Sequence, residues 1–203
     1  MNDQPLLNWA DLPANDGTAD DTAGLIGRCL SGEQPAYVEL YDLFSGGVYR
    51  LAYSLLGDAQ DAEEVLQDSF EYAFRRLNHF DARKSAFKTW LYRIAVSRCR
   101  NKRRRKWLPS FSLSVFDGDE PSDPAAPLPD ERAQLNEQQR VVWAAVGELS
   151  PKLREVAILR YYAGLPYGEI GIVLGIPAKT AESRMRLAHK ALRERLSDIA
   201  GEE

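Results

Sequence analysis

The sequence predicts an all-α protein of two small helical domains joined by an acidic, Pro-rich linker. Apolar residues recur at three- and four-residue intervals on both sides of residues 107–132, which is the helical period. Residues 107–131 hold five prolines and six acidic residues but no Lys or Arg. Such a composition buries little and is typical of an extended linker. The chain therefore divides into an acidic tail (1–21), a first domain (22–106), the linker (107–132), a second domain (133–198) and a short tail (199–203).

The first domain shows four apolar stripes before its basic end. Three predict helices that end at Ser31-Gly32, at Gly46-Gly47 and at Gly57-Asp58, because glycine commonly follows a helix. The fourth predicts a helix over residues 61–77, and its outer face carries a polar, mostly acidic stripe: Asp61, Glu64, Gln67, Asp68 and Glu71. Solvation accounts for most stripes of this kind, so a plain surface remains an alternative to a docking face.

The helix predicted over residues 87–106 changes character along its length. Its first half places Phe87, Trp90, Leu91, Ile94 and Ala95 on one face, with Tyr92 among the residues on the others. From residue 93 onward it holds eight basic residues and no acid: Arg93, Arg98, Arg100, Lys102, Arg103, Arg104, Arg105 and Lys106. In a chain of net charge −4, charge sorted in this way favours a nucleic-acid partner. A solvated or disordered basic helix end is the alternative.

The second domain ends in a helix-turn-helix pattern. Helices are predicted over 135–149 and over 152–162, the latter opened by Ser150-Pro151. A short helix then turns at 175–177 into a long one, and the second helix of such a pair enters the DNA major groove. The outward face of the long helix presents Lys179, Glu182, Ser183, Arg186, His189, Lys190 and Arg193. A plain αα-hairpin in a helical core is the alternative.

Reactive residues are few. The only cysteines are Cys29 and Cys99 and the only histidines are His79 and His189, and their spacing matches no metal-binding or redox motif. The sequence therefore predicts neither an enzyme, a cofactor nor a metal site. No apolar run reaches the roughly 18 residues of a membrane span, and the start lacks the features of a signal peptide. We expect no membrane insertion and a cytoplasmic location.

Four stretches in order carry a family resemblance: LIGRCLSGE (25–33), YRLAYSLLGDAQDAEEVLQDSFEYAFRRL (49–77), FKTWLYRIAVSRCRNKRRR (87–105) and LSPKLREVAILRYYAGLPYGEIGIVLGIPAKTAESRMRLAHKAL (149–192). Over residues 22–197 the chain resembles bacterial RNA polymerase sigma factors of the extracytoplasmic-function (ECF) type, in the sigma-70 family. The resemblance implies that the two domains are sigma regions 2 and 4. It also implies that they direct core RNA polymerase to promoters by opening a −10 element and binding a −35 element.

The resemblance assigns roles residue by residue. It implies that Asp61, Glu64, Gln67, Asp68 and Glu71 bind core polymerase, whose contacts involve the β′ coiled coil and the β subunit. It implies −10 DNA contacts, with one base flipped into a pocket, for Asp81, Arg83, Lys84, Ser85, Trp90, Tyr92, Arg93, Ser97, Arg98, Asn101 and Lys102. It implies −35 contacts for Lys179, Thr180, Glu182, Ser183, Arg184, Arg186, His189 and Lys190. An anti-sigma factor is implied as a regulatory partner.

The recognition helix departs from the family pattern. Relatives commonly carry Val and then Lys or Arg where this chain has Ala181 and Glu182, and often Arg where it has His189. Glu accepts a hydrogen bond from cytosine but repels phosphate, so the −35 sequence does not transfer from relatives. The alternative function, a stand-alone helix-turn-helix regulator of duplex DNA, leaves the 61–77 helix and the linker unexplained.

Overall fold

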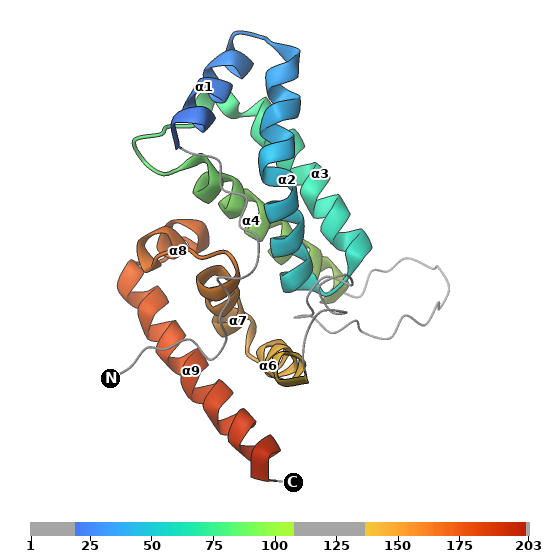
Figure 1. The fold of residues 1–203 in the computed structure, drawn as a ribbon, viewed down its shortest axis with the longest axis vertical. Helices are drawn as coiled ribbons and strands as arrows, with labels where there is room; N and C mark the ends of the chain where they lie inside the picture. Colours follow the sequence, from blue (N-terminus) through green and yellow to red (C-terminus); the bar gives the residue numbers. More distant parts are fainter. Residues whose placement is uncertain (1–18, 108–136, 202–203) are drawn as a thin grey trace.

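The computed structural model describes residues 19–107 and 137–201, and every regular element within those ranges is a helix (Figure 1). The predicted all-α class is confirmed. The calls on the linker and on most of the N-terminal tail lie outside the described residues. Within the described part, no helix is both long enough and apolar enough to cross a membrane.

The first domain packs four α-helices and one short 3-10 turn. They are α1 (Ala19–Leu30), α2 (Gln34–Leu56), α3 (Ala59–Arg75), η2 (Leu77–His79) and α4 (Phe87–Trp107). Helices α2, α3 and α4 pack on one another around fully buried side chains such as Leu40, Leu51 and Leu91. Asp58 caps α3, because its side chain accepts a hydrogen bond from the Asp61 amide at 2.7 Å. The core thus fixes the face that α4 turns inward.

Helix α2 continues through Gly46-Gly47, so the expectation of a helix end there is wrong. A Cβ atom added at Gly47 would lie 2.6 Å from the hydroxyl oxygen of Tyr92 in α4. Glycine is therefore needed at position 47 for the close approach of two helices and not for a turn. Tyr92 itself is buried, with only 5% of its surface exposed. Its predicted position on an outer face is therefore also wrong.

The second domain contains α6 (Glu137–Gly147), α7 (Pro151–Ala157), the π-helical η3 (Ile158–Tyr162), α8 (Tyr167–Leu174) and α9 (Ala178–Gly201). Helices α8 and α9 form the predicted helix-turn-helix. A Cβ atom added at Gly171 would lie 2.7 Å from the Ile176 carbonyl oxygen, so the turn folds tightly back on α8. Helix α9 then runs along the side of the domain that faces away from α4 (Figure 1).

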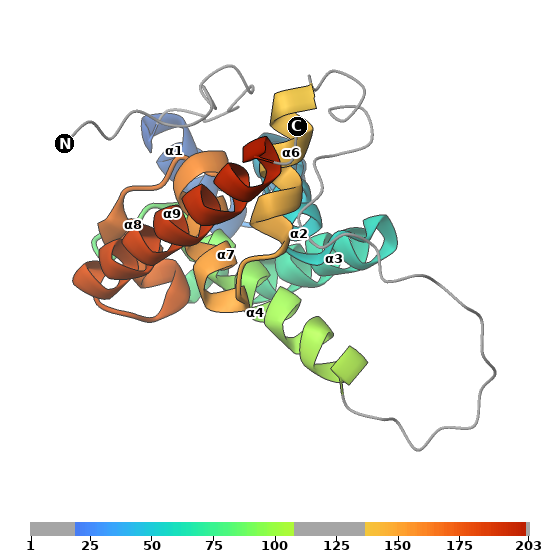
Figure 2. The same ribbon diagram turned by 90° about the horizontal axis from the view of Figure 1, so that it is seen from below.

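The two domains pack directly against each other. Helix α4 lies between the rest of the first domain and the α7–α8 side of the second (Figures 1 and 2), and it contacts α8 extensively. At this boundary the Thr89 hydroxyl of α4 donates a hydrogen bond to the Glu169 carboxylate of α8. Helix α4 consequently packs against both domains.

Gly47→Ala is expected to lower the free energy of unfolding by about 1 kcal/mol, because overpacking against Tyr92 outweighs the gain in helix propensity. In a Tyr92→Phe background the same change is expected to raise it by up to about 1 kcal/mol, since the clashing oxygen is gone. Gly46→Ala is the matched control, because its Cβ would meet only Arg50, at 3.5 Å. Urea unfolding measures the free energy of unfolding of each variant. The same sign for Gly47→Ala in both backgrounds would contradict the proposed contact.

Candidate nucleic-acid interface

The basic end of α4 is not uniformly open to solvent. Of its described cations, Arg100, Lys102 and Arg103 each bind a carboxylate from another helix. The Arg98 guanidinium lies over the Tyr72 ring of α3, 5.2 Å from its centroid. The charge run therefore divides into cations with partners inside the protein and cations that face solvent.

Lys102 joins α4 to the acidic stripe of α3. Its Nζ lies 2.9 Å from Oδ1 of Asp61 and also contacts the Glu64 carboxylate. Partial burial by itself lowers the pKa of Lys102, but the hydrogen bonds to Glu64 and Asp61 outweigh this and raise it overall. One predicted DNA contact and two predicted polymerase contacts thus bind each other in this structure.

A polar face of α4 does stay exposed. Arg93, Ser97, Asn101 and Arg104 are all exposed and follow one another at four- and three-residue spacing, so they share one side of the helix. The first three were predicted to face DNA, and Arg104 extends the same face toward the helix end. This side offers two cations and two hydrogen-bonding side chains to a partner.

The loop before α4 is organised by Asp81. The Asp81 carboxylate accepts hydrogen bonds from the Arg83 backbone amide at 3.1 Å and from its guanidinium at 3.0 Å. The Arg83 hydrogen bond lowers the pKa of Asp81. Lys84 also lies 3.8 Å from this carboxylate, while Ser85 is half-buried. The four predicted loop residues are therefore neighbours, and Arg83 and Lys84 extend into solvent.

An aromatic cluster supports this loop. The rings of Phe80, Phe87 and Trp90 lie 5.5–5.6 Å apart, centroid to centroid. Trp90 is half-buried, so part of its ring remains accessible. Next to the cluster, a cleft of about 560 Å³ separates the loop from residues 164–169 of the second domain. Ser85 and Lys88 line one side of this cleft and Glu169 lines the other.

The remaining polar positions on α3 face solvent. Gln67, Asp68 and Glu71 are exposed, and Glu71 pairs with Arg75 one turn along the same helix. Among the five predicted polymerase contacts, these three are separate from the Lys102 pair. The C-terminal half of the stripe thus makes no contact with Lys102, whereas Glu64 combines its contact to Lys102 with a side chain that is 51% exposed.

The recognition helix presents most of its predicted face. Lys179, Glu182, Arg186 and Lys190 are exposed on one side of α9, whereas Thr180, Ser183 and Arg184 are half-buried beside them. Arg186 donates a 3.3 Å hydrogen bond to the Ser183 hydroxyl, and Lys190 lies 3.8 Å from Glu194. The first of these contacts orients the Arg186 side chain along the exposed face.

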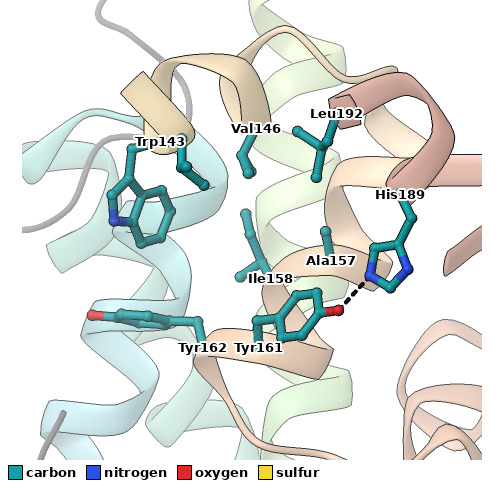
Figure 3. A pocket seen from close by; sticks show the side chains of 9 residues that line it. Trp143, Val146, Ala157, Ile158, Tyr161, Tyr162, His189 and Leu192 are labelled. Atoms are coloured by element: carbon teal, nitrogen blue, oxygen red, sulfur yellow. Dashed lines mark hydrogen bonds between the residues drawn. The ribbon is translucent and has the colours of Figure 1, made fainter. Parts of the chain in front are cut away.

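His189 does not lie on this outward face. Its ring points toward α7 and η3, where Nε2 hydrogen-bonds the Tyr161 hydroxyl (Figure 3). The two side chains line a small apolar pocket of about 30 Å³ together with Trp143 and Leu192. The expectation that His189 faces outward is therefore wrong, because its polar ring is used inside the domain.

Sequence reasoning missed the contact that joins the domains. Glu155 of α7 is buried, with a side chain only 4% exposed, and it binds both Arg100 and Arg103 of α4. The partners are separated by 55 and 52 residues, so no local pattern connects them. The only available signal was an acidic residue beside the inward-facing Val156 and Ala157.

The described residues contain no group of three or more His, Cys, Asp or Glu side chains arranged to hold a metal ion. Cys29 and Cys99 are both buried and unpaired. Burial raises the pKa of the Cys99 thiol to about 12, which keeps it protonated and unreactive at neutral pH.

Comparison with known proteins gives the family of both domains. Residues 40–108 match the family model of sigma-70 region 2, and residues 139–192 match that of sigma-70 region 4. The chain is 31% identical to the ECF RNA polymerase sigma factor SigW of Bacillus subtilis, over 86% of this chain and 96% of the relative. This chain belongs to the ECF sigma factors. It is also 30% identical to the RNA polymerase sigma-H factor of Pseudomonas aeruginosa, over 91% of this chain and 98% of that protein.

Solved structures support the same architecture for this sigma factor. CnrH, determined in complex with the cytosolic domain of CnrY, is 25% identical with a TM-score of 0.64, over 89% of this chain and 99% of CnrH. The sigma factor RpoE from Bartonella quintana, determined in complex with the anti-sigma factor NepR, is 22% identical with a TM-score of 0.59, over 79% of this chain and 96% of that chain, and shows the fold alone. The first domain is region 2 of the sigma factor and the second is region 4.

Lys102→Met is expected to lower the free energy of unfolding of region 2 by about 1–3 kcal/mol, because it leaves the half-buried Asp61 carboxylate without its cation. Adding Asp61→Asn is expected to recover part of the loss, since the amide does not need a counter-charge. Arg104→Met removes an equivalent charge from the exposed face and should leave the urea midpoint unchanged. Equal midpoints for Lys102→Met and Arg104→Met would show that the Lys102 pair contributes nothing to the fold.

Proposed function

We propose that this sigma factor directs core RNA polymerase to promoters through three separate surfaces: α3 for polymerase, α4 with its preceding loop for the −10 element, and α9 for the −35 element. The observation that carries the proposal is that α4 and α9, in different domains, each keep an exposed polar face beside a well-packed apolar one. Two DNA-facing helices on one chain fit a bipartite promoter better than a single operator.

The α4 surface has the chemistry that an opened DNA strand requires. Non-specific contacts to a single strand combine backbone cations with aromatic rings on which bases stack. Arg93 and Arg104 supply cations on the exposed face, and the half-buried Trp90 supplies an aromatic ring near the loop. A base extruded from the duplex costs a few kcal/mol, so a pocket beside these cations stabilises the open form. The cleft next to Ser85 and Lys88 is the proposed place for such a base.

The α9 surface has the chemistry for reading duplex DNA. An Arg that binds guanine in a bidentate manner contributes about 1–3 kcal/mol of discrimination, whereas a Lys on phosphate contributes affinity with little sequence preference. We assign the first role to Arg186 and the second to Lys179 and Lys190. Glu182 lies on the same exposed side, where its carboxylate would accept a hydrogen bond from the cytosine amino group.

The polymerase surface is assigned to the half of the α3 stripe that does not bind Lys102. Gln67, Asp68 and Glu71 are exposed, whereas Asp61 and Glu64 bind Lys102. We infer that the first three make the direct contacts to the polymerase and that Asp61 and Glu64 act only if Lys102 is displaced. Regulation by an anti-sigma factor is part of the proposal and rests on membership of the family.

Run-off transcription tests the proposed function. Core RNA polymerase with and without this chain, on the same genomic fragments, is expected to give different start sites. A chain carrying Arg93→Ala, Asn101→Ala and Arg104→Ala should lose promoter opening, read as permanganate reactivity of thymines, because its exposed α4 face is removed. Arg76→Ala with Lys152→Ala is the control, since it removes two exposed cations that belong to none of the three proposed surfaces. Identical products with and without the chain would reject a sigma function, and tight binding of promoter duplex without polymerase would favour a stand-alone regulator.

Glu182→Lys is expected to give tighter but less selective −35 binding. The change removes a base contact and adds a cation for the DNA backbone. Transcription from a library with a randomised −35 element measures the selected sequences. Glu194→Lys makes the same charge change on the same helix about three turns away and should leave the selected sequences as in the wild type. If Glu182→Lys also selects the wild-type sequences, Glu182 does not face the bases.

A further inference from the structure

A buried acid of region 4 occupies two arginines of the −10 helix. The Glu155 Oε2 atom lies 2.7 Å from Arg100 Nη2, and its Oε1 atom lies 3.1 Å from Arg100 Nε and 2.7 Å from Arg103 Nη2. Both carboxylate oxygens are therefore used, and Arg100 binds them with the two-pronged geometry of the guanidinium fork. We call these three residues the Glu155 cluster. Its ion pairs join region 4 to region 2.

Arg100 belongs to the same side of α4 as the exposed polar face. It follows Arg93 by seven residues and Ser97 by three, and it precedes Arg104 by four, which are the spacings of helix neighbours. With Arg100 released, the exposed side would read Arg93, Ser97, Arg100, Asn101 and Arg104 as one continuous basic face. Region 4 thus binds a cation in the middle of the face assigned to DNA, although the Arg100 side chain stays 41% exposed.

The guanidinium fork binds carboxylate and phosphate with the same paired hydrogen bonds. Moreover, the buried Nη1 atom of Arg103 has no hydrogen-bond partner among the described residues. One carboxylate cannot saturate two guanidinium groups, so the cluster leaves a donor unused that a further anionic oxygen would satisfy. The arginines therefore have more binding capacity than Glu155 uses.

We propose that Glu155 takes the place of a promoter phosphate on Arg100 and Arg103, so that region 4 and DNA compete for the same two cations. In the closed chain, Glu155 of region 4 binds both arginines. The Thr89–Glu169 hydrogen bond also joins the two regions, near the start of α4. Contacts between the regions therefore occur near both ends of this helix. Opening of the two regions adds Arg100 and Arg103 to the −10 surface as further DNA-binding residues.

This inference rests on the proposed role of α4, and a matched pair of variants separates the two ideas. Glu155→Gln breaks the cluster and leaves both arginines in place. Arg100→Gln with Arg103→Gln breaks the same ion pairs but removes the cations. Both should open the chain, and only the first should gain DNA affinity. Glu148→Gln is the control, because it makes the same charge change as Glu155→Gln on an exposed acid that pairs with Arg195 inside region 4.

Opening is measured on the full chain, without DNA, by spin labels at Gln60→Cys in α3 and Lys152→Cys in α7, both of which are exposed positions. The native Cys29 and Cys99 are buried and should stay unlabelled. Wild type and Glu148→Gln are expected to give one narrow distance distribution. Glu155→Gln and the double arginine variant are expected to give a longer, broader one. If both variants keep the wild-type distribution, the chain has not opened and the proposed competition is overturned, whatever the run-off assay shows.

DNA binding is measured by the anisotropy of a labelled short single-stranded DNA of mixed sequence, without polymerase. Glu155→Gln is expected to bind at least tenfold more tightly than wild type. Two added phosphate contacts should steepen the dependence of log affinity on log salt by about 1.4, at roughly 0.7 per contact on single strands. If Glu155→Gln opens but binds no better than the double arginine variant, then Glu155 masks no DNA contact and the inference fails. The proposed function then stands or falls on the run-off products of the wild-type chain.

If Glu155→Gln fails to fold, seen as lost helical signal, the double arginine variant decides, because its changes lie on the half-exposed surface of α4. That variant must open the chain for the inference to survive. A longer distance in it supports the cluster as the contact that closes the chain, and an unchanged distance overturns it.

Discussion

A buried carboxylate needs a counter-charge, and in this sigma factor that requirement joins the two domains. Glu155 is buried where α7 of region 4 meets α4 of region 2, with a side chain only 4% exposed, and its cations come from α4. Removing one partner of a buried ion pair costs far more than the intact pair contributes, because the remaining charge stays in a poorly solvating environment. The contact therefore fixes which surfaces meet more than it adds to stability.

Helix α4 satisfies several demands at once, and the residues left over define its available surface. Phe87 and Leu91 belong to the region 2 core, Lys102 ties the helix to α3, and Arg100 and Arg103 tie it to region 4. The exposed polar face is what remains after these contacts. A run of like charges in a sequence can thus serve three different partners, and only the packing of neighbouring helices assigns each cation to one of them.

Helical periodicity was sufficient for the fold class and for the helix-turn-helix, because apolar spacing of three and four reports a buried face directly. It failed where one residue type serves two purposes. Glycine ends helices, but Gly47 lies inside one to admit Tyr92, and Tyr92 and His189 are amphipathic side chains whose polar atoms do not imply an outer face. The Glu155 cluster was beyond reach because Glu155 lies 55 and 52 residues from its two arginine partners, on a helix that looks independent in sequence. Local patterns define faces, whereas pairing across domains depends on how those faces dock.

Ionic strength acts unequally on the two uses of the same arginines. A buried or partly buried ion pair is screened far less by salt than a contact between exposed charges. Binding of phosphates, in contrast, weakens steeply as salt rises, because the released counterions return to a more concentrated solution. If Glu155 and DNA compete for Arg100 and Arg103, higher salt therefore shifts the balance toward the closed chain even though both contacts are electrostatic. The burial of Glu155 is the reason why salt favours the closed chain. An exposed acid at the same position would bind the arginines less tightly as salt rises, just as DNA would.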